Sequence, residues 1–454
     1  MNSESAPLPV SLREAFCFWL KIGLLSFGGP AGQISLMHQE LVQRKRWISE
    51  RRYLHALNYC MVLPGPEAQQ LATYIGWLMH RSWGGVMAGA LFVLPSLLIL
   101  IGLSWIYVSF GQVDWVSGLF YGIKPAVTAI VLQAAHRMGS RALQHPVLWA
   151  MAVASFVAQF VFNLPFPAIV IAAALCGWIL SRVRPGVFSA PHGHGNKQVA
   201  ESPALIDDDT PRQGHTHFSL RRLLEVLAIG ALLWALPMAG LVFVWGWDHT
   251  LTQMAWFFSK AALLTFGGAY AVLPYVYQGA VEHFGWVTAT QMIDGLALGE
   301  TTPGPLIMIV AYVGYLGGHV GALLGPEHLF AAGALAACVA TWFTFLPSFI
   351  FILAGGPLVE STHNQLHLTA PLTAITAAVV GVVLNLTLFL SAHVFWPQGY
   401  SAKGLLGGVD GFALAMAAAA ALALLRYKRS VMEVIAASAL LGWVVKMTPH
   451  WLVA

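Results

Sequence analysis

The chain has 454 residues, of which 58% are hydrophobic and only 9% are charged, with a net charge of +4 and a mean hydropathy of +0.70. A soluble domain carries about 25% charged residues, so this composition excludes a water-soluble protein. No arginine-rich arm indicates a nucleic-acid partner. Long apolar stretches recur, each close to the roughly 20 residues that a helix needs to cross a bilayer. They run without the polar–apolar alternation of a membrane barrel, so the sequence predicts an all-α polytopic membrane protein in a lipid bilayer.

The first two apolar segments contain helix breakers. Segment 12–37 holds Lys21, breaks at Gly28-Gly29-Pro30 and lacks a signal-peptide cleavage site, so we expect it to insert uncleaved. Segment 55–79 breaks at Pro64-Gly65-Pro66. If it crossed the membrane fully, the basic loop 38–53 would lie outside, against the preference of Lys and Arg for the cytoplasm. We therefore predict that both segments are re-entrant hairpins.

Four full crossings are expected next, at 85–108, 116–138, 145–162 and 166–182. A polar stretch rich in Pro, Gly, His and Asp follows, and its composition is typical of a disordered linker. Basic residues flank this linker on both sides, which places it in the cytoplasm. The predicted organisation is a first membrane repeat (1–183), a cytoplasmic linker (184–220), a connecting transmembrane helix (221–248) and a second membrane repeat (249–454).

The linker contains four histidines that could bind a metal ion in passing: His192, His194, His215 and His217. A solvated linker offers no ordered scaffold for such ligands. The four cysteines are scattered singly and form no metal or redox motif. We therefore expect neither a metal site nor a cofactor.

The two halves of the chain repeat one another. Residues 26–29 (SFGG) match 265–268 (TFGG), and at the same spacing Lys21 pairs with Lys260 and 64–66 (PGP) pairs with 303–305 (PGP). One short insertion later, 94–96 (LPS) matches 346–348 (LPS). Several matches in one order indicate a duplication. Because a single crossing separates the halves, the second repeat should be inverted, as in transporters whose site lies at the midplane. This favours nine full crossings plus four re-entrant hairpins, with the N-terminus cytoplasmic and the C-terminus periplasmic; about thirteen crossings is the alternative.

The helix breaks are the candidate substrate site. A helix that starts after a break exposes free N–H groups and a positive dipole end, which suit an anion. Four breaks related by a pseudo-twofold axis would direct several helix ends to one point. Neighbouring amide and hydroxyl groups could donate to oxyanion oxygens, although a packing role is equally open. The candidate substrate-binding residues are Phe27, Gly28, Gly29, Pro64, Gly65, Pro66, Gln69, Gln70, Phe266, Gly267, Gly268, Thr301, Thr302, Pro303, Gly304 and Pro305.

Four charged residues near the breaks are candidates for chemistry. Lys21 and Lys260 precede the two Gly-Gly breaks, and we include both among the candidate substrate-binding residues, facing the anion. The alternative is that they snorkel to the interface or pair with a nearby carboxylate. Glu67 follows the first Pro-Gly-Pro and Glu300 precedes the second. A buried carboxylate can carry a proton, or it can simply pair with a lysine or cap a helix.

These motifs resemble the chromate ion transporter family, in its long two-domain form. The resemblance rests on FGGP (27–30), LPGPEAQQLATYIGW (63–77), LPS (94–96), LTFGGAYAVLPYV (264–276) and TTPGPLIMIVAYVGYLG (301–317). It implies a secondary active transporter that exports chromate across the bacterial inner membrane, driven by protons, with sulfate as a competing substrate. It also implies that the FGG and PGP elements are functional.

Other functions remain open from the residues alone. A passive oxyanion channel or a sulfate transporter would use the same helix ends, and a homodimer is not excluded. A membrane enzyme would need a nucleophile or metal constellation. The sequence has no H-E-x-x-H and no G-x-S-x-G motif, so we expect that the protein is not an enzyme.

Overall fold

The computed structural model describes residues 9–111, 113–183, 204–207, 215–361, 369–397, 399 and 408–448. These residues form helices without a β-strand, apart from one isolated bridge between Ile48 and Ile206. The helices of the first half are α1 (Leu12–Leu25), α2 (Gly29–His38), the π-helix Gln39–Arg44, α3 (Glu50–Val62), α4 (Glu67–Phe110), α5 (Asp114–Ala142), α6 (Pro146–Phe160) and α7 (Phe166–Val183). The connecting helix is α8 (Leu220–Trp245), and the second half contains α9 (Thr250–Leu264), α10 (Ala269–Tyr277), the π-helix Gln278–His283, α11 (Ala289–Thr301), α12 (Ile309–Val320), α13 (Leu329–Ser361), α14 (Thr369–Phe395), α15 (Gly411–Leu425) and α16 (Val431–Met447).

The described chain is that of a multi-pass membrane protein. Six segments are long and apolar enough to cross a bilayer: Glu67–Phe110, Asp114–Ala142, Phe166–Val183, Leu220–Trp245, Pro326–Glu360 and Ala370–Phe395. Helices α6, α15 and α16 are shorter, with 15, 15 and 17 residues, so the number of crossings stays a prediction. Large apolar side chains such as Phe243 on α8 are exposed on the outside of the bundle, where lipid replaces water as the solvent.

Helix α4 consists of two helical segments. His80 and Arg81 have non-helical backbone angles, and the chain reverses there. Gly76 and Gly84 then face each other so closely that a Cβ on Gly76 would lie 2.4 Å from the carbonyl oxygen of Gly84. The segment before residue 80 is thus a short arm packed against the long helix that follows, which separates the expected hairpin from the expected crossing 85–108.

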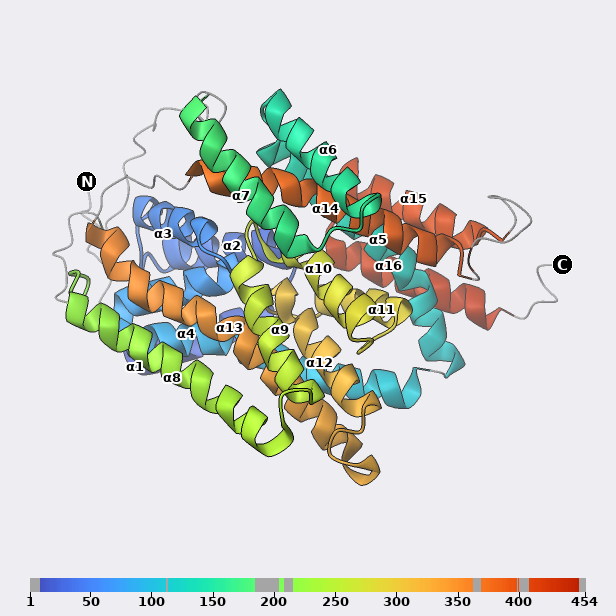
Figure 1. The fold of residues 1–454 in the computed structure, drawn as a ribbon, viewed down its shortest axis with the longest axis horizontal. Coiled ribbons are helices and arrows are strands. Elements are labelled where there is room, and N and C mark those ends of the chain that lie inside the picture. Colours follow the sequence, from blue (N-terminus) through green and yellow to red (C-terminus); the bar gives the residue numbers. More distant parts are fainter. Residues whose placement is uncertain are drawn as a thin grey trace.

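Helices far apart in the sequence lie side by side (Figure 1). Helix α5 packs against α15 and α16, while α14 packs against α6 and α7. In the same way, α1 packs against α4 and α9 packs against α13. These pairs are reciprocal, because α5, α6 and α7 correspond in chain order to α14, α15 and α16. Such reciprocal pairing supports the inverted repeat, which we retain as a proposal.

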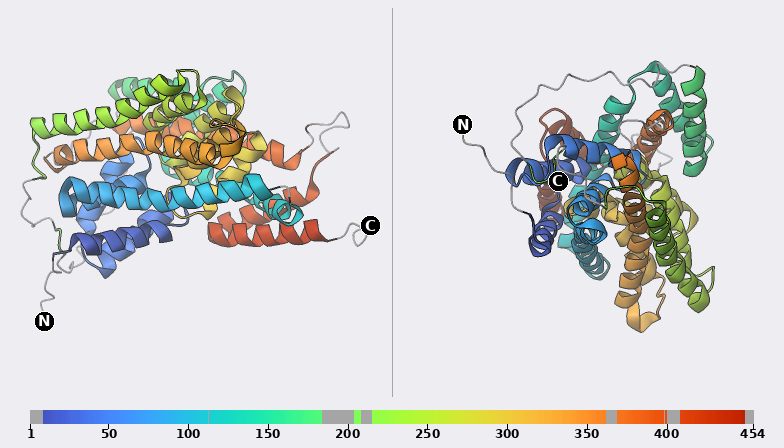
Figure 2. Two further views of the ribbon diagram at one scale, coloured as in Figure 1. Left: turned by 90° about the horizontal axis from the view of Figure 1, so that it is seen from below. Right: turned by 90° about the vertical axis from the view of Figure 1, so that its left-hand side faces the viewer.

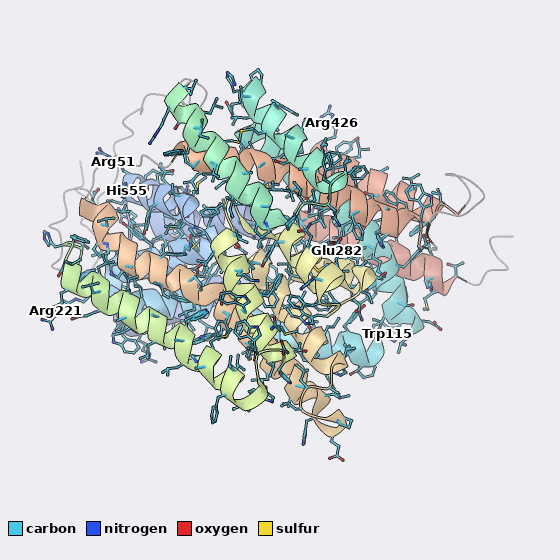
Figure 3. All side chains as sticks on the ribbon, viewed as in Figure 1. Arg51, His55, Trp115, Arg221, Glu282 and Arg426 are labelled. Carbon is cyan, nitrogen blue, oxygen red and sulfur yellow. The ribbon has the colours of Figure 1, made fainter. Side chains whose placement is uncertain are left out.

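The bundle is elongated, with α1 and α16 at opposite ends of its long axis (Figure 2). The connecting helix α8 lies along the outside of α13. Arg51 and Arg221 lie at the end from which the chain enters α8, and Trp115 lies toward the other end (Figure 3). We call these the linker end and the far end.

Two short pieces of the predicted linker are packed against the first half. The backbone N–H of Ser49 donates to the carbonyl of Ile206, and Ile206 is buried. His215 is buried as well, and one of its ring nitrogens lies 3.1 Å from the carbonyl oxygen of Trp77. We expected no packed structure in this linker; these pieces pack because they carry apolar or aromatic surface. His192 and His194 lie outside the described residues.

Candidate functional site

The four helix breaks meet at the centre of the molecule. The backbone N–H of Gly65 donates to the carbonyl of Thr265 at 2.7 Å, and the N–H of Gly304 donates to the carbonyl of Ser26 at 2.8 Å. Each Pro-Gly-Pro of one half is therefore joined to the Gly-Gly break of the other. Gly65 and Gly304 have φ values of +130° and +102°, a region that favours glycine.

Side chains from both halves close this crossing. A Cβ on Gly65 would lie 2.4 Å from Oγ of Ser348, and a Cβ on Gly304 would lie 2.6 Å from Cβ of Ser96. The two serines belong to the repeated LPS motif. The side-chain amide of Gln33 donates to the carbonyl of Gly304 at 2.5 Å. The glycines are thus required both by backbone angle and by space.

A cavity of about 920 Å³ extends from the crossing toward the linker end. Its walls come from α2, α3, α5, α10, α14 and the start of α4. The polar and charged lining residues are Ser35, His38, Glu50, Tyr53, Glu67, Gln133, Arg137, Arg141, Gln144, Tyr270, Thr373 and Thr376. A volume of this size is typical of small-molecule sites.

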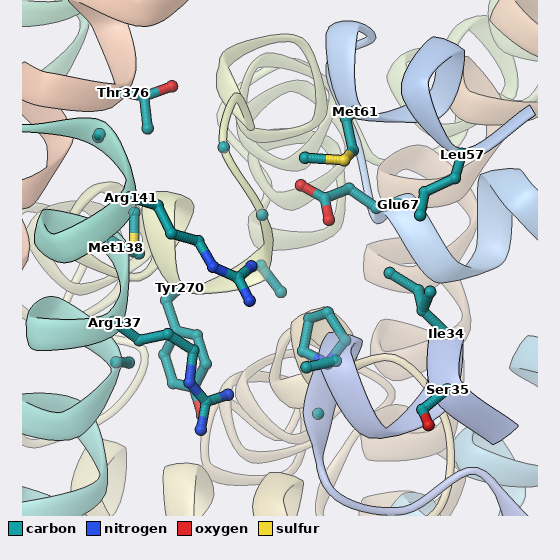
Figure 4. Close-up of a pocket in the computed structure, with 18 of the residues that line it drawn as sticks. Ile34, Ser35, Leu57, Met61, Glu67, Arg137, Met138, Arg141, Tyr270 and Thr376 are labelled. Carbon is teal, nitrogen blue, oxygen red and sulfur yellow. The ribbon is translucent and has the colours of Figure 1, made fainter. Parts of the chain in front are cut away.

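Two arginines of α5 dominate the charge of this cavity. Arg137 and Arg141 are one helical turn apart, and both guanidinium groups extend into the space between α5 and the opposite wall (Figure 4). Neither side chain forms an ion pair within the described residues. Glu67 lies on the opposite wall, within electrostatic reach of Arg141. The only other described carboxylate in the lining, Glu50, is 2.5 Å from a ring nitrogen of His38.

Three of the helices that begin at the cavity follow the predicted breaks. Gly28 and Gly29 lead into α2, Gly267 and Gly268 lead into α10, and Glu67 is the first residue of α4. The N–H groups of a first helical turn have no partner inside the helix, and the dipole places partial positive charge there. Together with two guanidinium groups that form no ion pair among the described residues, these helix ends make a pocket that favours an anion.

Glu300 lies just behind the cavity wall. Tyr270 lines the cavity, and its hydroxyl donates to Oε1 of Glu300 at 2.5 Å. Glu300 itself is only 4% exposed, and Arg137 is near enough to influence it electrostatically. A buried carboxyl group is therefore connected to the cavity through one phenol.

The structure places only some of the sequence-predicted residues in the cavity lining: Gly28, Gly29, Glu67, Gly267 and Gly268. The remaining break residues form the crossing behind it: Phe27, Pro64, Gly65, Pro66, Phe266, Pro303, Gly304 and Pro305. The predicted polar donors already have partners within the protein. Gln69 donates to Thr73, Gln70 to the Pro64 carbonyl and to Oγ of Ser348, Thr301 to the Ala297 carbonyl and Thr302 to the Gly299 carbonyl.

The two lysines lie away from the cavity lining. Lys21 is exposed on α1, and Nζ of Lys260 lies 5.5 Å from the ring centroid of Trp256. An anion-binding role for them stays a prediction without a contact to support it. Sequence reasoning missed Arg137 and Arg141 because they lie at the end of the expected crossing 116–138, where basic residues are typical of a cytoplasmic loop.

Comparison with known proteins identifies the family. The sequence profile of the chromate transporter family matches residues 13–178 and 252–443, one segment in each half. A chromate transport protein of Pseudomonas aeruginosa is 33% identical over 452 residues, covering 98% of this chain and 95% of that protein. A chromate transport protein of Cupriavidus metallidurans is 29% identical over 383 residues, covering 84% of this chain and 83% of that protein.

A shorter relative matches only part of the chain. The uncharacterized transporter YwrA of Bacillus subtilis is 29% identical over 161 residues, which are 35% of this chain but 90% of that protein. No solved structure matches the protein. The duplicated motifs, the all-helical membrane architecture and the family match across both halves agree, and the chain belongs to the chromate transporter family.

Proposed function

We propose that this protein exports chromate from the cytoplasm and that the cavity beside Arg137 and Arg141 is its anion-binding site. The observation that carries the proposal is the pair of guanidinium groups without an ion pair in the described structure. They lie in a cavity of about 920 Å³ that the starts of α2, α4 and α10 also line. Chromate is a tetrahedral dianion, and guanidinium groups donate two parallel hydrogen bonds to oxyanions. The names of the relatives support chromate as the substrate.

The residues that line the cavity support export as the proposed direction. Its lining includes Gln144 and Val431, next to the ends of α5 and α16 at which the basic residues Arg141 and Arg429 gather. Loops rich in Lys and Arg prefer the cytoplasm. We place the protein in the inner membrane with its linker end in the cytoplasm. The cavity then faces the cytoplasm, and a cytoplasmic anion can enter it directly.

Proton coupling is assigned to Glu67 and Glu300. Glu67 shares the cavity with Arg141, so its negative charge competes with a bound dianion for the same guanidinium field. Glu300 reaches the same cavity through Tyr270. The carboxylates thus link proton and anion occupancy at one site.

Two alternatives remain for the experiment. Sulfate has the same charge and geometry as chromate, and the pocket contains no group that would distinguish them. A passive channel would conduct without a gradient. Labelled chromate uptake into inside-out vesicles, energised and then uncoupled, separates these cases: uptake that collapses on uncoupling supports the coupled exporter, whereas uptake indifferent to the gradient supports a channel. Sulfate added as competitor measures selectivity.

Variants of the arginines test the site itself. A charge-assisted hydrogen bond contributes about 1.5–3 kcal/mol, so Arg137→Ala or Arg141→Ala should raise the KM for chromate by roughly 10- to 150-fold. Arg137→Lys keeps the charge but loses the planar fork and should recover part of the affinity. Arg182→Ala is the matched control, because Arg182 is also in a last helical turn but stacks on Trp178 at 3.9 Å. Unchanged KM in both alanine variants would remove the arginines from the site.

A further inference from the structure

A second buried charge cluster lies outside the cavity, around Asp294 of α11. Asp294 is 2% exposed. Its Oδ1 lies 3.4 Å from Nζ of Lys124 on α5, and its Oδ2 accepts a hydrogen bond of 2.8 Å from the hydroxyl of Tyr107 on α4. Neither the repeat nor the motif search pointed to these residues, because they come from three separate segments of the chain.

The surroundings of Asp294 are otherwise apolar or phenolic. Tyr312 of α12 packs edge-on to Tyr107, with ring centroids 5.6 Å apart, and is completely buried. Helices α14 and α16 also pack against α11, but within the described residues they bring no ion pair or hydrogen bond to this carboxyl group. Lys124 is therefore its one described charged partner, and the lysine side chain is 25% exposed. A buried carboxylate held by one ammonium group is costly to leave unpaired.

The cluster and the cavity are joined by the same two helices. On α11, Asp294 precedes Glu300 by six residues, or about 9 Å along the axis. On α5, Lys124 precedes Arg137 by thirteen residues, or about 20 Å toward the far end. Helix α11 begins on the far side of the crossing and ends at the central break. Two carboxyl groups and one phenol thus lie in sequence toward the cavity: Asp294, then Glu300, then the hydroxyl of Tyr270 in the cavity wall.

We propose that Asp294 is a second proton carrier of this transporter, on the far side of the crossing, with Lys124 as its counter-ion. The proposal rests on the proposed function and extends it. A proton from the far aqueous phase neutralises the Asp294 carboxylate and releases Lys124 from the ion pair. The proton then passes to the Glu300 carboxylate, which restores the Asp294 anion, and leaves Glu300 through the cavity. One proton enters and one leaves, and no other reactant is consumed.

Helix α5 also gives the ion pair a connection to the substrate. Because Lys124 and Arg137 belong to one helix, a displacement of α5 on anion binding or release moves the ammonium group relative to Asp294. The protonation of Asp294 and the occupancy of the arginines would then be linked through a rigid element. An exchange of chromate for chromate needs no net proton transfer, so it should not depend on Asp294.

Purified full-length protein in liposomes separates these properties. Counterflow of labelled chromate against internal chromate reports binding and translocation. Accumulation driven by an imposed pH gradient reports coupling, since a gradient of one pH unit supports about tenfold accumulation per coupled proton. Asp294→Asn should keep counterflow within about threefold of the wild type and lose the tenfold accumulation. Asp294→Glu should restore part of it. Glu282→Gln is the control, because Glu282 is an exposed carboxylate in the π-helix Gln278–His283 that precedes α11.

The outcomes are distinct. Wild-type protein that moves no chromate in either assay refutes the proposed function and not this inference alone. Asp294→Asn that accumulates chromate like the wild type overturns the inference. If Asp294→Asn loses counterflow too, proton release on chromate binding is measured with a pH dye at alkaline pH, where chromate is fully deprotonated. If the number of protons released per bound chromate differs between Asp294→Asn and Glu282→Gln, the result supports Asp294 as a proton carrier. If the number is the same, the inference is overturned.

Discussion

Replacement of Gly304 by alanine is the sharpest test of the central crossing. Gly304 has φ of +102° and donates its N–H to the carbonyl of Ser26. A Cβ at this position would lie 2.6 Å from Cβ of Ser96 and 3.5 Å from the carbonyl oxygen of Phe92. The substitution therefore imposes both an unfavourable backbone angle and a steric overlap at the point where the two halves meet.

The expected cost can be worked from these two terms. A non-glycine residue in a sparsely populated backbone region costs about 1–3 kcal/mol. Insertion of a carbon atom into a filled space costs about 1–3 kcal/mol more. Gly304→Ala should therefore lower the free energy of unfolding by about 2–6 kcal/mol, or shift the Gly304–Ser26 contact enough to impair transport.

Three comparison variants separate the terms. Gly102→Ala lies in α4 with nothing within 4 Å of its Cβ position, so it should be neutral or slightly stabilising, because alanine favours helix. Gly28→Ala has φ of +85° and open space, so it should carry the backbone cost alone. In the double variant Gly304→Ala with Ser96→Gly, removal of the Ser96 Cβ should make the loss smaller than the sum of the single effects.

Thermal unfolding of the detergent-solubilised protein and chromate uptake in vesicles are the two assays. The reasoning is refuted if Gly304→Ala unfolds at the same temperature as Gly102→Ala and transports chromate at the wild-type rate. The steric part of the reasoning is refuted if Ser96→Gly does not reduce the destabilisation caused by Gly304→Ala, because that destabilisation would then come from the backbone angle alone. Separate readouts matter, since a stable but inactive variant would place the glycine in the transport movement.

Two further predictions concern the linker end. Arg52→Ala should destabilise the protein by about 3–5 kcal/mol, because it removes the guanidinium group that lies 2.8 Å from Glu360, whose side chain is 3% exposed. The Tyr74 hydroxyl would then be the remaining described partner of Glu360. An unchanged temperature of thermal unfolding would contradict this prediction. Burial lowers the pKa of His215 below its ordinary value of 6.5, so the docked segment should be stable above this pH and be released as the pH falls, when the undocked imidazole takes up a proton. Limited proteolysis should show faster cleavage at acidic pH in the wild type and at all pH values in His215→Ala, while the exposed His217→Ala should behave as the wild type does.

The backbone of the central site was largely predictable from the sequence. Glycine and proline act locally, so a repeated Gly-Gly or Pro-Gly-Pro in an apolar segment indicates a break wherever it occurs. The same order of motifs in both halves also indicated that the breaks would meet. Gly65 and Gly304 do meet the opposite half through reciprocal hydrogen bonds. The helical membrane architecture followed from the composition and from the length and continuity of the apolar stretches.

The charges of the site were not predictable in the same way. Arg137 and Arg141 had a sufficient explanation at the end of a crossing, and only the packing of α2, α3 and α14 shows that a cavity reaches them. Lys124 and Asp294 are far apart in the sequence, so no local pattern joins them. The rule that an ionisable residue in a membrane segment marks a function could have found both, had it been applied beyond the helix breaks.

The backbone breaks are repeated in both halves but the arginines of the cavity are not, and this difference bears on the direction of transport. Arg137 follows Gln133 by four residues, and its counterpart in the second half, four residues after Asn385, is Phe389. The counterpart of Arg141 is His393, whose ring lies 4.0 Å from that of Phe389. An inverted repeat allows the halves to exchange conformations and open a matching cavity toward the far end. That cavity would present an aromatic pair in place of two guanidinium groups, so a dianion would be held strongly on the cytoplasmic side and weakly on the other. Under the proposed inverted repeat and orientation, this asymmetry of charge would favour release to the outside, as the proposed export requires.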